Sequence, residues 1–91
     1  MTRIYTDYWT CDRVAFQSDE RIVCGVLDER LRTGQNRYAP YLGVVQADPH
    51  AAYVFPAGSP QALLMAQRAA HAPGSFTVLT FDGYVAYQPI G

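Results

Sequence analysis

Four residues of types that bind metal or act as nucleophiles stand far apart in this chain: Cys11, Cys24, His50 and His71. Zinc sites draw two ligands from one turn, in patterns such as Cys-x-x-Cys, and no such pair is present. A cysteine–histidine catalytic pair would need a sharp turn that carries the nucleophile, and the sequence has no such motif. The pattern therefore predicts no metal, no cofactor and no catalytic cysteine, and we expect a protein that is not an enzyme.

The two cysteines do not make the disulfide framework of a small secreted domain. We therefore expect Cys11 and Cys24 to be free, reduced and dispensable for function. No apolar run approaches the ~20 residues of a membrane span, and the N-terminus lacks the pattern of a secretion leader. The prediction is a cytoplasmic protein without membrane contact.

Acidic residues form two neighbouring pairs, Asp19-Glu20 and Asp28-Glu29. Adjacent residues point to different sides of a helix, so neither pair has the geometry of an acid–base couple. We expect Asp28 to pair with Arg32 on a solvated helix face. The glycines are isolated, which argues against a phosphate-binding loop. These patterns add no catalytic function.

The basic residues are all arginine, and the net charge is −1. Arginine is enriched and lysine depleted in buried parts of interfaces, although GC-rich codon usage gives the same bias. Arg30, Arg32 and Arg37 lie close together in sequence, beside Asp28 and Glu29. Since these acids dilute the positive field, the cluster fits an acidic protein surface better than nucleic acid.

Aromatic residues make up 13% of the chain, and seven of them are tyrosines. As a group they are more than the core of so small a domain accommodates. A tyrosine hydroxyl needs a partner or water, so we expect some of these rings at the surface. Packing half-buried on a sheet is the alternative. Tyr8 and Trp9 are adjacent on an expected edge strand, residues 3–10, and point to opposite faces. One of the two should therefore be exposed.

The clearest element that positions these residues is a helix near the end of the chain. Ser59 and Pro60 are a capping residue and a first-turn proline, and Pro73-Gly74 ends the helical run. The expected apolar face holds Ala62, Leu63, Met65, Ala66, Ala69 and Ala70, and the polar face holds Gln61, Gln67, Arg68 and His71. Leu64 lies in the middle of the polar face, which indicates a small apolar anchor inside a polar rim.

A hairpin follows this helix, since residues 75–81 and 84–88 flank Asp82-Gly83, the strongest short hairpin signal. A two-residue loop pairs Phe81 with Tyr84, Leu79 with Ala86, and Val78 with Tyr87. Phe76, Val78, Val85 and Tyr87 then share the face expected to form the core.

The earlier elements are less sharply marked. Residues 41–46 and 51–55 predict a second hairpin around a turn at 47–50. Residues 13–17 have strand composition. For residues 19–32 a helix is favoured by acids at the start and arginines at the end, and a strand by the Ile-Val-Cys-Gly-Val run.

The fold class follows from this order of elements. With a helix at 19–32 the order is β-α-β-β-α-β plus a C-terminal strand, which is the ferredoxin-like arrangement. With a strand there, the chain is a β-meander that carries one helix. Either way we expect one α+β domain over residues 1–91, a small antiparallel sheet with one or two helices on one face.

The function hypothesis is a non-catalytic protein-interaction domain, a small regulator or inhibitor that blocks a larger complex sterically. One concrete form is a phage or mobile-element protein acting on a host defence system, although no residue carries that form. The partner is another protein, and a homodimer is a second arrangement. The candidate partner-binding residues are Tyr8, Trp9, Arg30, Arg32, Arg37, Leu64 and Arg68.

The alternative is a ferredoxin-like dimer that binds or converts a small ligand between sheet and helices. In that case His50, His71 and a tyrosine are the acid–base candidates. A pocket that contains one of these histidines would favour the alternative, and a filled sheet–helix interface would favour the first hypothesis.

Overall fold

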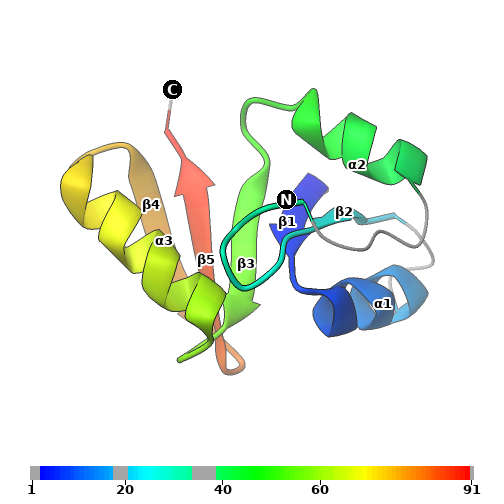
Figure 1. The fold of residues 1–91 in the computed structure, drawn as a ribbon, viewed down its shortest axis with the longest axis horizontal. Coiled ribbons are helices and arrows are strands. Elements are labelled where there is room, and N and C mark those ends of the chain that lie inside the picture. The colour runs from blue at the N-terminus through cyan, green and yellow to red at the C-terminus, as the bar shows by residue number, and fades with distance from the viewer. Residues whose placement is uncertain (1–2, 18–20, 34–38, 91) are drawn as a thin grey trace.

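The computed structural model of the chain describes residues 3–17, 21–33 and 39–90. These residues form one layered α+β unit (Figure 1), which confirms the predicted class. In chain order the elements are β1 (Arg3–Thr6), α1 (Tyr8–Gln17), β2 (Val23–Val26), α2 (Ala39–Gln46), β3 (Ala52–Pro56), α3 (Pro60–His71), β4 (Phe76–Phe81) and β5 (Tyr84–Pro89).

The strands make one sheet in the order β2-β1-β3-β5-β4. β1 is parallel to both of its neighbours, β2 and β3, whereas β5 runs antiparallel to β3 and β4. The ferredoxin-like order is therefore not the one observed, because that sheet is antiparallel throughout. The predicted antiparallel pairing holds only for the β3-β5-β4 half.

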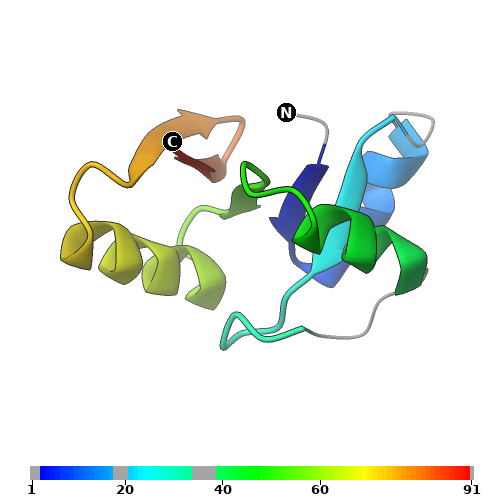
Figure 2. The ribbon, with the colours of Figure 1, turned by 90° about the horizontal axis from the view of Figure 1, so that it is seen from above.

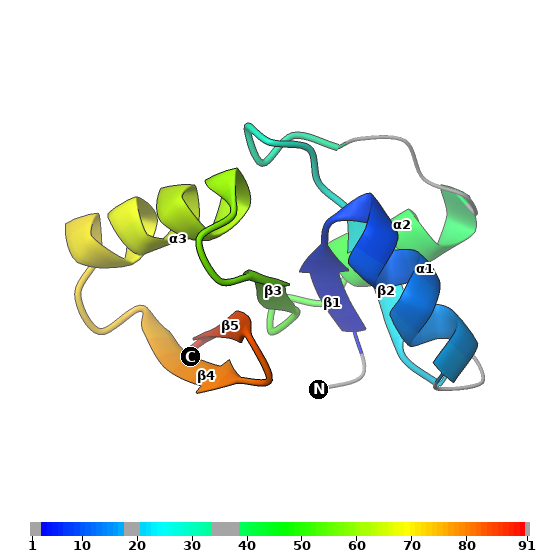
Figure 3. The same ribbon diagram turned by 90° about the horizontal axis from the view of Figure 1, so that it is seen from below.

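Helices pack on both faces of the sheet, not on one as predicted. Side chains alternate between faces along a strand. On one face Phe55 of β3 lies against α3 and is fully buried together with Met65. On the opposite face Ile4 of β1 and Cys24 of β2 pack with Cys11 of α1. Figure 2 and Figure 3 show α3 beside the β3-β5-β4 end and α1 beside the β2 end.

Four aromatic rings form a row across the face that carries α3. Tyr5 stacks on Tyr53 with ring centroids 4.8 Å apart, and Phe76 meets Tyr53 and Tyr87 edge-on at 6.3 and 6.4 Å. The Tyr87 hydroxyl donates to the Ala62 carbonyl of α3 at 3.4 Å, and burial raises the pKa of Tyr87. For these rings, packing on the sheet is the observed arrangement, and surface exposure is not.

The C-terminal hairpin is confirmed in its turn and its register. Asp82 and Gly83 both have positive φ, 48° and 80°, as a two-residue turn of this type requires. The three predicted strand pairs are all present. Val78, however, is 49% exposed, so the expected core face is only partly covered.

The strand predicted over residues 3–10 ends at Thr6, and a helix replaces its second half and the strand predicted at 13–17. Asp7 is the reason: its carboxylate accepts the backbone N–H of Thr10 at 3.2 Å, which is an N-cap interaction. Tyr8 therefore begins a helix, where it does not alternate with its neighbour across a sheet.

The helix favoured for residues 19–32 is also wrong. Val23–Val26 is a buried strand, since an apolar run with β-branched residues suits a parallel sheet covered on both faces. Residues 28–33 form a turn, described below. The expected helical pairing of Asp28 with Arg32 is replaced by backbone hydrogen bonds within that turn.

The strand predicted at 41–46 is helical instead and belongs to α2. Pro40 is tolerated in the first turn of this helix. Val45 is fully buried, and Leu42 lies so close to Gly25 that a Cβ added there would be 2.8 Å from the Leu42 Cδ1 atom. Packing against β2 thus overrides the strand preference of the two valines.

Cys11 and Cys24 form a disulfide with their Cα atoms 5.8 Å apart. The prediction of two free thiols is wrong, because the crossover from β1 through α1 to β2 brings the two residues together. The bridge ties α1 to β2 across the face opposite α3. The cytoplasmic location stays a prediction.

Candidate functional site: a basic hollow between a turn and helix α3

The first wall of the site is the turn at residues 28–33, organised by one aspartate. The Asp28 Oδ1 atom accepts the backbone N–H groups of Arg30 and Arg32 at 2.9 and 3.0 Å. The Asp28 backbone carbonyl accepts the N–H of Leu31 at 3.0 Å, and the Asp28 backbone N–H donates to the Arg32 carbonyl at 2.7 Å. The N–H groups of Arg32 and Arg30, followed by the positive charges of those residues, lower the pKa of Asp28. Its carboxylate therefore supports the turn.

Leu31 occupies an unusual backbone conformation in this turn. Its φ is 61°, in the left-handed region, which costs a non-glycine residue about 1–2 kcal/mol. The side chain is only 9% exposed and joins the core cluster of Phe55 and Met65. Burial of Leu31 thus offsets the backbone strain, and the two arginines beside it are left at the surface.

The second wall is α3, which begins where the sequence predicts. The Ser59 hydroxyl accepts the N–H of Ala62 at 3.2 Å, and Pro60 is the first helical residue. The orientation of the helix differs from the prediction. Gln61 is buried and lies 3.5 Å from the Leu27 carbonyl, to which its side-chain amide donates, whereas Leu63 is 60% exposed. The helix is turned toward Gln61 because that amide satisfies a buried carbonyl.

This rotation changes the position of Leu64. It is half-buried and packs against the core cluster, so it is not the exposed anchor that was predicted. Leu64 nevertheless borders solvent on the side of the helix that faces the turn. The apolar anchor is therefore a surface shared by Leu64 and Leu31, and Leu64 also contributes to stability.

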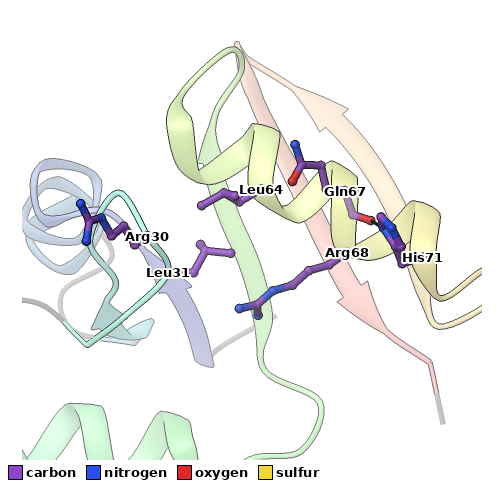
Figure 4. A pocket seen from close by; sticks show the side chains of 6 residues that line it. All are labelled: Arg30, Leu31, Leu64, Gln67, Arg68 and His71. Atoms are coloured by element: carbon purple, nitrogen blue, oxygen red, sulfur yellow. Dashed lines mark hydrogen bonds between the residues drawn. The ribbon is translucent and has the colours of Figure 1, made fainter.

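Between the two walls lies a hollow of about 290 Å³, lined by Arg30, Leu31, Leu64, Gln67, Arg68 and His71. In Figure 4 Leu31 and Leu64 approach each other from the two walls. The Arg68 side chain reaches from α3 toward the turn. The Arg30 guanidinium, on the turn, points away from α3 and from the hollow. His71 lies on the last turn of the helix with Nδ1 2.8 Å from the Gln67 carbonyl oxygen. The hollow thus combines an apolar floor with a cationic rim.

Within residues 3–17, 21–33 and 39–90, the arginines of the rim form no salt bridge. Among the described residues the salt bridge found is Arg3 to Asp48, 3.7 Å, which does not involve the hollow. No carboxylate of the described residues lines the hollow; Glu29, next to Arg30, is exposed on the turn, and the Asp28 carboxylate accepts backbone N–H groups. Arg68 therefore presents positive charge beside the apolar floor, whereas the Arg30 guanidinium lies on the outer side of the rim.

The structure brings three of the seven predicted partner-binding residues together: Arg30, Leu64 and Arg68. Arg32 is exposed on the same turn but does not line the hollow, and Arg37 lies outside the described residues.

Tyr8 and Trp9 lie on α1, away from the lining of the hollow. Their rings meet edge-on at 5.3 Å, and Trp9 is 78% exposed. The predicted exposure of one of these two aromatics is confirmed. The edge strand from which that exposure was predicted is not observed, since both residues lie on a helix.

Leu31 was missed as a site residue. Gln67 and His71 were named only as part of the polar rim around Leu64, and His71 also as an acid–base candidate for the alternative function. An aspartate followed by polar residues is a turn signal, because its carboxylate bonds N–H groups two residues on. Recognition of that signal at Asp28 would have placed the turn. It would not have placed Leu31 against α3, which is a long-range contact.

The two histidines are not gathered at one place. His50 lies in the turn before β3, where its N–H donates to the Asp48 carboxylate at 2.9 Å and its carbonyl accepts from the Gln88 amide. In the part of the chain that the structure describes, no three His, Cys, Asp or Glu side chains are grouped to hold a metal ion. With one imidazole and no carboxylate among the described residues that line it, the hollow is suited to holding an anion.

Comparison with protein-family models, with curated proteins and with solved structures finds no match for this chain. Over the described residues, no helix has both the length and the apolar character that crossing a membrane requires.

Proposed function

We propose that this chain is a non-catalytic protein-interaction domain that binds an acidic segment of a larger protein and blocks that protein sterically. The hollow between the 28–33 turn and α3 is the binding surface. The segment would place an apolar side chain on Leu31 and Leu64, and a carboxylate beside Arg68.

The observation that carries this proposal is the pairing of an apolar floor with Arg68, which forms no salt bridge with any of the described residues. Interfaces combine an apolar centre with a polar rim, and arginine is among the residues whose truncation weakens binding most. A carboxylate beside Arg68 would form a charge-assisted hydrogen bond, the stronger kind. The sheet–helix interface supports the same proposal, since Phe55 of β3 and Met65 of α3 are both fully buried in it.

A second candidate, a binding site for a small anionic ligand, is favoured by one observation. The hollow has about the volume of the smallest ligand pockets, and His71 lines it. A small anion would depend on the cations alone, whereas an acidic segment would also need the two leucines. The two candidates therefore differ in their dependence on an apolar group.

Titration of the ¹⁵N-labelled chain tests the proposal. The probes are a short peptide with one leucine among aspartates and glutamates, the same peptide with serine for leucine, and its lysine counterpart. The leucine peptide is expected to shift the amide signals of Leu31, Leu64 and Arg68, the serine peptide to shift them less, and the lysine peptide not at all. Equal effects of both acidic peptides and of citrate would favour the small-anion candidate. Shifts confined to other elements would contradict both.

A further inference from the structure

The outer edge of β4 is a second surface, independent of the hollow. Among the described strands β4 is the last of the sheet and pairs only with β5. In Figure 2 none of the described elements lies beyond it. One row of its backbone N–H and C=O groups is therefore open to another strand.

The register identifies these open groups. Phe81 and Tyr84 close a two-residue turn and so form a hydrogen-bonded pair, after which bonded and non-bonded pairs alternate along the hairpin. Pro89, which has no N–H, accordingly stands opposite Phe76 in a non-bonded pair. The next pair is bonded again, since the Ile90 N–H donates to the Ser75 carbonyl at 2.9 Å. The outward-facing groups therefore belong to Phe76, Val78 and Thr80.

β4 lacks the features that protect an edge strand. Its sequence, Phe-Thr-Val-Leu-Thr-Phe, contains no charge, no proline and no glycine. Val78 and Leu79, at its centre, are 49% and 50% exposed on opposite faces. Natural edge strands are blocked by lysine, proline, bulges or covering elements, and an edge without them is suited to pairing.

We propose that a second copy of this chain pairs with β4 in antiparallel orientation, with Val78 of one copy opposite Val78 of the other. A two-fold axis perpendicular to the sheet requires facing residues to lie on the same face. A two-fold axis that passes between the two Val78 residues meets this condition, and it places Phe76 opposite Thr80 of the second copy. All three outward-facing residues are then bonded, with about six hydrogen bonds, two for each facing pair.

Charge is compatible with a second copy and favours the antiparallel direction. Asp82 is the only charged residue of the hairpin, residues 75–89. In the antiparallel register it stands opposite Gly74 of the second copy, whereas parallel pairing would set the two aspartates side by side. Like charges directly opposite each other destabilise strand pairing, so the antiparallel dimer avoids a repulsion that the parallel one carries.

Sedimentation of the full chain over a concentration series, with two matched variants, tests the dimer. Val78→Lys and Leu79→Lys add the same charge at adjacent, equally exposed positions. Only the first sets two lysines opposite each other, so Val78→Lys is expected to weaken dimerisation at least about tenfold and Leu79→Lys by less than about threefold. Thermal melts establish that both variants are folded.

Amide hydrogen exchange of the unmodified chain gives a second readout that needs no variant. The N–H groups of Phe76, Val78 and Thr80 are expected to gain protection as the concentration rises, while those of Thr77, Leu79 and Phe81 are protected throughout. A chain that stays monomeric at several hundred micromolar overturns the proposal. So does a dimer that both variants weaken equally, or one that forms without protection of the three outward amides.

Discussion

The C-terminal half of this molecule, β3 to β5, and its N-terminal half, β1 to α2, differ in the range of the interactions that determine their secondary structure. In the C-terminal half, helix α3 is set by Ser59 and Pro60, and the hairpin by Asp82-Gly83. These signals act within a few residues. In the N-terminal half, parallel strands meet through crossovers, and a disulfide joins residues 13 positions apart. Local chemistry therefore determines one half, and distant contacts determine the other.

The largest effect should come from the bridge that holds the N-terminal half. Replacing both Cys11 and Cys24 by serine is expected to lower the free energy of unfolding by about 3 kcal/mol, the cost of opening a loop of this length. Denaturant unfolding with and without reductant measures it. Reductant should destabilise the parent and leave the double variant unchanged. Two titratable thiols in the folded, purified parent would show that the bridge is absent.

The turn that sets the C-terminal half comes next. Gly83→Val places a β-branched residue at a φ of 80°, and the expected loss is about 1–3 kcal/mol. Because the turn is local, the loss should appear as faster hydrogen exchange in β4 and β5 with the disulfide still formed. Thermal melts that coincide with those of the parent would contradict this role of the turn.

Two glycines of the N-terminal half form a matched pair. A Cβ at Gly25 would lie 2.8 Å from the Leu42 side chain, so Gly25→Ala is expected to destabilise the fold by about 1 kcal/mol, at the low end for overpacking, because Leu42 can move. At Gly43, inside α2, a Cβ meets nothing within 4 Å, and Gly43→Ala should stabilise the fold by up to about 1 kcal/mol. Chemical denaturation measures both. Equal effects would mean that α2 does not pack on β2 as described.

The smallest effect concerns pH and the turn that forms one wall of the hollow. The pKa of Asp28 is lowered in the folded state by the N–H groups of Arg32 and Arg30. Its stabilisation is therefore present above the ordinary pKa of aspartate and is lost as the pH falls through the lower folded pKa. Asp28→Asn, which keeps an acceptor without the charge, should show a weaker loss of stability in acid. Identical acid unfolding curves would remove this role from Asp28.

The parts of the fold predicted from sequence follow the same division. Ser59 and Asp82-Gly83 act on their immediate neighbours, so α3 and the hairpin register were predicted correctly. Asp7 gives a local signal too, but the strand composition around it masked the cap. Val45 and Gly25 were misassigned because their conformations depend on packing between α2 and β2.

The candidate site joins the two halves, which explains why only part of it was found. Arg30 and Arg68 stand out by residue type, and Leu64 by its place on a helical wheel. Leu31 has no such signal, since it is held by a left-handed turn against a helix more than thirty residues later. The same contact gives the hollow its apolar floor.

The most direct test of the account is a reversal of charge at the rim of the hollow. With the acidic leucine peptide and its lysine counterpart as probes, the parent should bind the acidic peptide at least about tenfold more tightly. Arg68→Glu should abolish or invert that preference. Arg13→Glu makes the same charge change on α1, where Arg13 contacts the Tyr84 ring and hydroxyl, and should leave the preference intact. Binding of the acidic peptide by the folded Arg68→Glu variant as tightly as by the parent would contradict the account.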